Sequence, residues 1–151
     1  MNMDQDAHPH LKELVAGFAD EPGDFEVRIE GRFSSAHYLV KYFPDGSDEP
    51  LHGHSWLVEV TLGRAGGGIG ADGIVYDFLA ARRRLDELCD RIEHVIINNL
   101  PEFAGVNPTA ENVARWFYRG LRPAVDESGG RVIEVRVHEG PGNIALFRPA
   151  R

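Results

Sequence analysis

The stretch LHGHSWLVEVTL, residues 51–62, places two histidines two positions apart at the start of a run rich in Val and Leu. Side chains of a strand alternate between its two faces, so residues i and i+2 point the same way. His52 and His54 therefore present both imidazoles on one face, and Gly53 lies on the other. Neighbouring neutral imidazoles suit a transition metal. The pattern predicts a strand that carries part of a metal site; the alternative is a polar pair on a solvated face.

A third histidine, His37, follows FSSA in the preceding predicted strand, which begins near Phe25. Consecutive strands tend to pair, so we expect His37 beside the histidine pair. Three imidazoles on one ion leave the fourth position of a tetrahedral site open to water or substrate, as in catalytic zinc sites. Glu49 lies three residues before His52. It is a candidate general base or occasional metal ligand, unless it is only a solvated loop acid.

Two further acids are candidates for chemistry. Glu93 directly precedes His94 near the end of the first predicted helix. A carboxylate beside an imidazole can form a proton shuttle, although such a pair can also be merely solvated. Glu139 ends a strongly alternating segment, where it could accept two parallel N–H bonds from an amidine-like or guanidine-like ring edge or simply form a turn. The same alternation turns His138 to the opposite face.

Composition limits the classes of protein that fit this chain. Its 151 residues are 42% hydrophobic and 26% charged, which is typical of one globular domain. A formal charge of -8 argues against nucleic acid or an anionic membrane as the main partner. No apolar run reaches membrane-spanning length, and the N-terminus has no signal-peptide pattern. The one cysteine, Cys89, fits a reducing compartment, so we expect a cytoplasmic protein.

The order of predicted elements is ββααββ. The first two strands end near Leu62, and a helix begins near Asp77 or Phe78. Asn107 is the expected N-cap of a second helix, with Pro108 in its first position. RVIEVRVHE and NIALF form the closing strands. This order predicts an α+β domain, an antiparallel sheet with two helices on one face. We expect residues 25–151 to form this single domain and residues 1–24 to be an extension with a short helix.

A glycine-rich segment contains the literal pattern G-x-G-x-x-G at Gly68, Gly70 and Gly73. A dinucleotide fingerprint requires a helix that opens inside the motif, with its N-terminus at the pyrophosphate. Here the glycines lead into the extended apolar segment IVYDF, and no lysine stands where a Walker loop requires one. The segment is therefore expected to be a flexible connection rather than a nucleotide site.

Six short motifs in order resemble those of the 6-pyruvoyl-tetrahydropterin synthases and the related 6-carboxy-tetrahydropterin synthases. The motifs are FSSAH (33–37), HGHSW (52–56), VYDF (75–78), IEHVIIN (92–98), NPTAEN (107–112) and VHEG (137–140). The resemblance covers about residues 25–147. It implies a T-fold with a four-stranded antiparallel sheet and two helices. It also implies a homo-oligomer in which trimeric barrels stack as a hexamer, a dimer of trimers.

The resemblance also implies the roles of particular residues. His37, His52 and His54 would bind zinc. Glu139 would anchor the amino-pyrimidine edge of a pterin substrate, with help from Thr109. Glu93 and His94 would belong to the proton relay and would serve the zinc site of a neighbouring subunit.

The chain departs from the family pattern in ways that concern the reaction. The usual catalytic cysteine before H-G-H is absent, Glu93 replaces the usual aspartate, and Gly140 replaces a common threonine. Glu49 instead completes the E-x-x-H-G-H pattern of a branch that cleaves the side chain of 7,8-dihydroneopterin triphosphate. That branch yields 6-hydroxymethyl-7,8-dihydropterin, so the resemblance implies folate or queuosine-type biosynthesis. The alternatives are another pterin or purine-like substrate, and a non-catalytic zinc-stabilised oligomer that binds a pterin.

Overall fold

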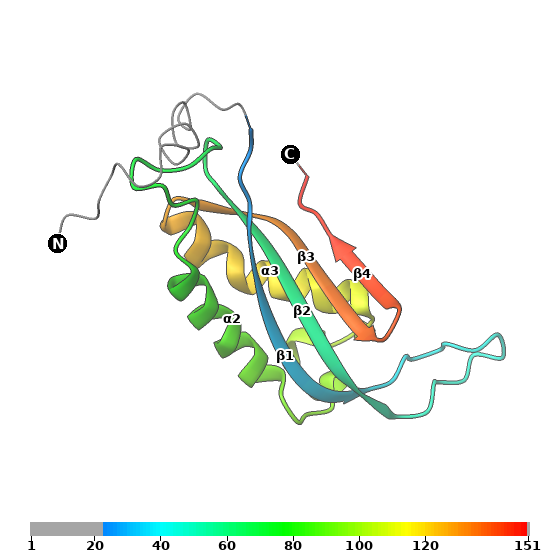
Figure 1. Ribbon diagram of the computed structural model, residues 1–151. Coiled ribbons are helices and arrows are strands. Elements are labelled where there is room, and N and C mark those ends of the chain that lie inside the picture. The colour runs from blue at the N-terminus through cyan, green and yellow to red at the C-terminus, as the bar shows by residue number, and fades with distance from the viewer. Residues whose placement is uncertain (1–22, 151) are drawn as a thin grey trace, which may run out of the picture.

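Four antiparallel strands form one sheet in the order β1-β2-β3-β4 in the computed structural model, which describes residues 23–150 (Figure 1). Their bounds are β1 Val27–His37, β2 His52–Arg64, β3 Gly130–Gly140 and β4 Asn143–Phe147. The predicted ββααββ order and α+β class are confirmed. The helix expected within residues 1–24 lies outside the described residues.

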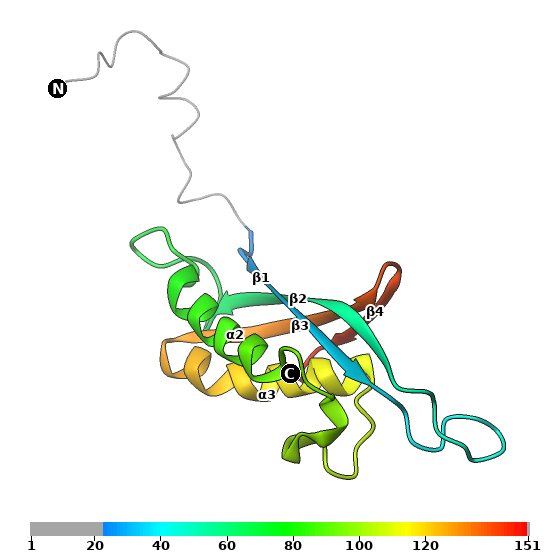
Figure 2. The same cartoon turned by 90° about the horizontal axis from the view of Figure 1, so that it is seen from below.

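Both long helices cover the same face of the sheet, as Figure 2 shows. Helix α2 spans Phe78–Ile92, and α3 spans Ala110–Glu127. Between them lie two short 3₁₀ turns, η2 (Ile97–Asn99) and η3 (Pro101–Phe103). Helix α2 begins where the sequence predicts, because the Asp77 carboxylate caps it by accepting the Leu79 N–H at 2.8 Å. No helix opens inside the glycine motif, so the geometry of a dinucleotide fingerprint is not present there.

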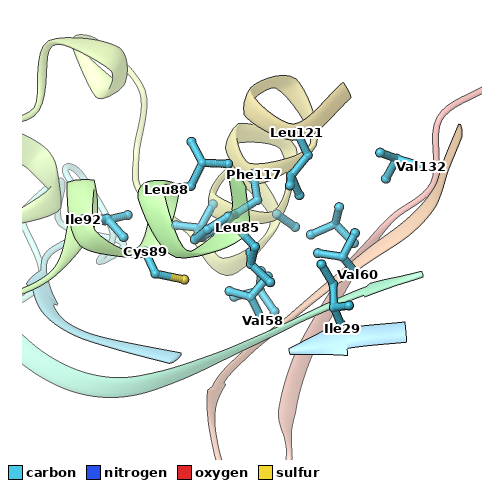
Figure 3. Close-up of a cluster of buried hydrophobic side chains, with 14 of the residues drawn as sticks. Ile29, Val58, Val60, Leu85, Leu88, Cys89, Ile92, Phe117, Leu121 and Val132 are labelled. Atoms are coloured by element: carbon cyan, nitrogen blue, oxygen red, sulfur yellow. The ribbon is translucent and has the colours of Figure 1, made fainter. Parts of the chain in front are cut away.

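The core lies between the sheet and the helices (Figure 3). Alternate residues of the strands meet the apolar stripes of α2 and α3, so each element buries the face that its periodicity predicts. Gly31 allows a close approach of α2 to β1: a Cβ there would lie 2.7 Å from Cys89 Sγ and 3.0 Å from Leu85 Cγ. Among the fully buried side chains are Ile29, Val58, Val60, Leu85, Phe117 and Leu121.

The start of α3 differs from the prediction. Thr109 is the N-cap, and Asn107 is not, because its amide has a partner elsewhere. Asn107 Oδ1 accepts the Val40 N–H at 2.8 Å, and its Nδ2 donates to the Val40 carbonyl at 3.1 Å. The Asn107 side chain is therefore engaged in two long-range hydrogen bonds with the Val40 backbone and does not cap the helix. Pro108 remains outside the helix, which leaves its carbonyl free to bond elsewhere.

The segment between β1 and β2, residues 38–51, extends beyond the end of the sheet (Figures 1 and 2). It is ordered by its own hydrogen bonds, such as those from Lys41 N–H to Asp48 Oδ1 at 2.8 Å and from Glu49 N–H to the Leu39 carbonyl at 2.9 Å. Glu49 is therefore held by backbone next to the start of β2. None of the helices within the described residues has the length and apolar content needed to cross a membrane.

Candidate metal centre

Four potential metal ligands from three strands meet at one end of the sheet. His37 ends β1, His52 and His54 begin β2, and Glu139 lies near the end of β3. One ligand atom of each lies within 4.8 Å of every other. The register of the sheet explains the convergence, because His37 pairs directly with His52. The structure places the three predicted imidazoles together and adds Glu139, which the sequence suggested only as a ring anchor.

Hydrogen bonds to backbone carbonyls select the tautomer of two imidazoles. His37 Nδ1 lies 2.8 Å from the Pro108 carbonyl, and His52 Nδ1 lies 2.8 Å from the Pro50 carbonyl. A carbonyl only accepts, so Nδ1 carries the proton in each ring and Nε2 of the neutral ring offers a lone pair. Metal-binding histidines commonly show this arrangement. Both rings are thus oriented to ligate through Nε2.

Two of the imidazole nitrogens, His37 Nε2 and His54 Nε2, are buried with no competing hydrogen bond within the described part of the chain. His37 is 1% exposed. Nε2 of His37 and Nε2 of His54 are both buried, and no described residue forms a hydrogen bond with either. Burial lowers the pKa of His54, although the neighbouring Glu139 carboxylate opposes the shift, so the neutral ring that a metal requires is favoured. Unpartnered buried nitrogens are costly, and a zinc ion held by three imidazoles and an oxygen would satisfy them.

Trp56 packs against two of the imidazoles. Its ring is fully buried and meets His37 and His54 edge to face, with ring centroids 5.1 and 5.5 Å apart. Its indole N–H donates to the Ser35 carbonyl at 3.4 Å, which ties β2 to β1. The bulky side chain thereby limits the rotamers of both histidines, and a metal site depends on this kind of rigid support.

Glu49 lies beside the cluster rather than in it. Its Oε1 is 3.9 Å from His52 Nε2, and its side chain is 22% exposed. Its Oε2 is buried without a hydrogen-bond partner among the described residues. Glu49 therefore lies next to the cluster, with one buried carboxylate oxygen that has no partner among the described residues.

Glu93 and His94 form a separate pair at the outer edge of β1. Glu93 Oε1 lies 3.0 Å from His94 Nε2, and Glu93 Oε2 accepts the Ser34 N–H at 2.7 Å. His94 has a positive φ of 53° and a side chain that is 78% exposed. It lines an open hollow of about 500 Å³ together with Ser34, Gly53 and His54. Neither Glu93 nor His94 is among the four side chains that meet at the metal cluster.

Thr109 lies next to the centre without joining it. Its hydroxyl accepts the Asn112 N–H at 3.3 Å as the N-cap of α3. Its neighbour Pro108 supplies the carbonyl that orients His37. Thr109 therefore positions the backbone that holds one candidate ligand, besides its suggested contact with substrate.

Cys89 is a core residue, as the sequence predicts. It is 6% exposed and packs between α2 and the sheet. Burial, assisted by Asp86, Asp90 and Glu93, raises the pKa of its thiol to about 12. The thiolate form is therefore scarce at neutral pH, and Cys89 does not replace the missing cysteine as a nucleophile.

Sequence reasoning missed two parts of the centre. The carbonyls of Pro50 and Pro108 leave no recognisable signal, because any residue supplies a carbonyl. The place of Glu139 among the histidines had a signal: alternation along β3 puts it on the covered face together with Val137. Val137 pairs with Val58, which lies on the same face of β2 as His54.

The sequence profile of the family described as 6-pyruvoyl tetrahydropterin synthase matches residues 26–150. The chain therefore belongs to the 6-pyruvoyl tetrahydropterin synthase family.

Two curated relatives bear names from the carboxy branch of this family. A protein of Archaeoglobus fulgidus, provisionally named a 6-carboxy-5,6,7,8-tetrahydropterin synthase, is 30% identical over 122 residues, which cover 81% of this chain and 94% of the relative. The 6-carboxy-5,6,7,8-tetrahydropterin synthase of Aquifex aeolicus is 32% identical over 108 residues. That match covers 58% of this chain and 65% of the relative.

Solved structures confirm the T-fold. The 6-pyruvoyl tetrahydropterin synthase of Caenorhabditis elegans superposes with a TM-score of 0.72 at 22% identity, covering 85% of this chain and 97% of that chain. A Plasmodium vivax 6-pyruvoyltetrahydropterin synthase, solved as the alanine variant of a catalytic glutamate, superposes with a TM-score of 0.65 at 19% identity. It covers 85% of this chain and 99% of that chain.

Proposed function

We propose that this chain is a zinc-dependent enzyme that cleaves the side chain of 7,8-dihydroneopterin triphosphate to give 6-hydroxymethyl-7,8-dihydropterin, with Glu49 as its base. The observation that carries the proposal is the position of Glu49, 3.9 Å from His52 Nε2 with one carboxylate oxygen buried and unpartnered. Membership of the family supports a pterin substrate. The catalytic glutamate of the Plasmodium vivax protein supports a carboxylate in this role.

His37, His52 and His54 would hold the zinc, because their buried or oriented Nε2 atoms face one another. When bound, zinc would act as a Lewis acid toward oxygens of the substrate side chain. Glu139 would accept N–H bonds from the amino-pyrimidine edge of the ring. A carboxylate matches that edge with two parallel hydrogen bonds and so fixes the orientation of the pterin.

The proposed reaction is a retro-aldol-type cleavage. Glu49 takes the proton of the side-chain hydroxyl on the second carbon, and that oxygen forms a carbonyl as the bond between the first and second carbons breaks. The electron pair of that bond passes to the first carbon, which stays on the ring and gains a proton. The products are then a hydroxymethyl pterin and a phosphorylated aldehyde, with no oxidant or reductant required.

The proton for the ring-bound carbon would come from Glu93 and His94 of a second copy. The pair points outward, and the His94 side chain is 78% exposed. A homo-hexamer of the kind implied by the resemblance would place one copy's pair at another copy's metal centre. We also retain the prediction that the protein works in the cytoplasm.

The names of the curated relatives favour a second candidate, a 6-carboxy-tetrahydropterin product from the same substrate. The absent cysteine weighs against it, because a thiol and a carboxylate differ in intrinsic pKa by several units. Replacing one by the other redirects where protons move, so we place the hydroxymethyl product first.

The test is to incubate zinc-loaded protein with 7,8-dihydroneopterin triphosphate and to identify products by mass spectrometry. We expect 6-hydroxymethyl-7,8-dihydropterin, and we expect Glu49→Gln to lower kcat by about 100-fold to 10,000-fold while zinc stays bound. Glu87→Gln is the matched control, because Glu87 is paired with Arg84 on the exposed side of α2. A carboxy product would establish the second candidate. Pterin binding without turnover would leave only a binding protein.

A further inference from the structure

The segment that carries Glu49, residues 38–51, contains no buried residue. Val40, for example, is 43% exposed. Its backbone N–H and C=O groups still need partners, and a segment that buries no side chain is held in place mainly by hydrogen bonds. Those hydrogen bonds therefore decide where Glu49 lies.

Two asparagine amides hold the first part of this segment. Asn98 Oδ1 accepts the Tyr38 N–H at 3.0 Å, and Asn98 Nδ2 donates to the Tyr38 carbonyl at 2.8 Å. Asn107 pairs in the same way with Val40, at 2.8 and 3.1 Å. Each amide supplies one acceptor and one donor, which match the N–H and C=O of a single residue. The two side chains therefore do for residues 38–40 what a neighbouring strand would do.

Glu49 is tied to the residue between these two pairs. Its N–H donates to the Leu39 carbonyl at 2.9 Å. The adjacent Asp48 accepts the Lys41 N–H through Oδ1 at 2.8 Å. A shift of residues 38–40 would therefore carry the Glu49 backbone with it.

Asn107 also directly precedes the residue that orients one of the imidazoles. The Pro108 carbonyl accepts the His37 Nδ1 proton at 2.8 Å, and Asn112 Nδ2, from the first turn of α3, donates to the Asn107 carbonyl at 2.9 Å. One stretch of backbone anchored to α3 thus fixes both a candidate metal ligand and the segment that leads to Glu49. The separation between the proposed base and the histidine cluster depends on this shared support.

We propose that Asn98 and Asn107 are positioning residues, whose amides set the place of the Glu49 carboxylate relative to the histidine cluster. This inference rests on the proposed role of Glu49 as the base, and it requires no contact of either asparagine with substrate. A misplacement of about 1 Å can cost on the order of 100-fold in rate. Loss of either amide should therefore lower kcat while zinc stays bound.

The experiment replaces each amide by a carboxylate of the same shape in the full chain, as Asn98→Asp and Asn107→Asp. Aspartate keeps the acceptor but turns the donor into a second acceptor, which then faces a carbonyl oxygen. Asn99→Asp is the matched control. Asn99 is exposed in the same 3₁₀ turn as Asn98, so this variant adds the same charge while both amides remain.

Hydrogen–deuterium exchange followed by mass spectrometry measures whether the two amides hold the segment. We expect the backbone amides of residues 38–51 to exchange at least about 10-fold faster in both variants, and we expect those of β3 to be unchanged. Asn99→Asp should match the wild type. Wild-type exchange in both Asn98→Asp and Asn107→Asp would overturn the inference, and this measurement does not depend on turnover.

Steady-state kinetics with 7,8-dihydroneopterin triphosphate measure whether the asparagines act through Glu49. We expect each variant to lower kcat at least about 10-fold, with KM within about threefold of wild type and zinc content unchanged. In a Glu49→Gln background the same substitutions should have no further effect on kcat, because the group that they position is gone. An equal loss of kcat in both backgrounds, or loss of zinc, would overturn the inference.

Failure of the proposed function has a different signature. It would appear as absent turnover in zinc-loaded wild-type protein. Failure of the positioning role would appear only in the variants, as wild-type exchange or as an effect on kcat that is independent of Glu49.

Discussion

Each face of the sheet carries a histidine beside a glutamate, but the two pairs differ in their other partners. On the face without helices, His138 Nε2 lies 2.7 Å from Glu59 Oε2. On the face covered by α2 and α3, His37 Nε2 lies 2.9 Å from Glu139 Oε1. Glu59 also pairs with Arg28 at 3.2 Å, whereas within residues 23–150 Glu139 is paired only with histidines.

The difference shows how the surroundings decide what one pair of residue types can do. The hydrogen bond from His138, with further help from Arg28 and Arg136, lowers the pKa of Glu59 despite its burial. The Glu59 carboxylate thus has cationic or hydrogen-bonding partners in His138, Arg28 and Arg136, and these contacts stabilise the sheet. Within the described residues the covered pair has no arginine beside it, and His37 Nε2 and His54 Nε2 have no hydrogen-bond partner, so a bound cation could satisfy both nitrogens. The first arrangement is structural, and the second is a group of side chains that could hold a metal ion.

The largest effect should come from removing a candidate metal ligand on the face that the helices cover. We expect His54→Ala to weaken zinc binding more than about 100-fold, since loss of even an outer-shell partner costs 10 to 100-fold. His138→Ala is the matched control, because the two side chains are similarly exposed, at 28% and 23%. That variant should keep its zinc. Competition with a metal-sensitive dye measures both, and equal zinc binding in the two variants would refute the assignment of His54.

An effect of intermediate size should come from removing the charge of Glu59, which forms an ion pair on the face without helices. A depressed pKa means that the Glu59 contribution is present above its unfolded pKa and is lost as pH falls through the folded value. We expect Glu59→Gln to lower the free energy of unfolding by about 1 to 2 kcal/mol at pH 7, and we expect the gap to close below about pH 4.

Urea titrations of both proteins at several pH values provide the measurement. Glu30→Gln is the control on the same face, because the Glu30 side chain is exposed and its carboxylate lies 3.7 Å from Arg32 Nη2. Its effect should stay below about 1 kcal/mol at every pH. A gap for Glu59→Gln that does not change with pH would show that its charge contributes nothing.

The smallest effect concerns the helix that supports the covered site. Thr109→Ala removes the N-cap of α3 and should cost about 1 kcal/mol of stability, while Thr109→Ser should retain the cap. Thermal unfolding measures the cost. If Thr109 also contacts the pterin, Thr109→Ala raises KM and Thr109→Ser does not. An unchanged KM in both variants would restrict Thr109 to capping.

Much of the fold was readable because its causes are local. Alternation along residues 51–62 and 131–139 predicted strands, and the apolar period after Asp77 predicted α2. The predicted N-cap of α3 was wrong because the Asn107 side chain accepts a hydrogen bond from Val40, a residue 67 positions away. A distant partner of this kind leaves no trace in the local pattern.

The sequence by itself determined which side chains share a face, since the periods of strand and helix depend on the backbone alone. It thereby predicted that His37, His52 and His54 could meet. Only the tertiary structure decided that Glu139 joins them and that Pro50 and Pro108 carbonyls orient two of the rings. Those contacts depend on how distant segments pack, and a carbonyl or an acid acquires such a role only from its neighbours in space.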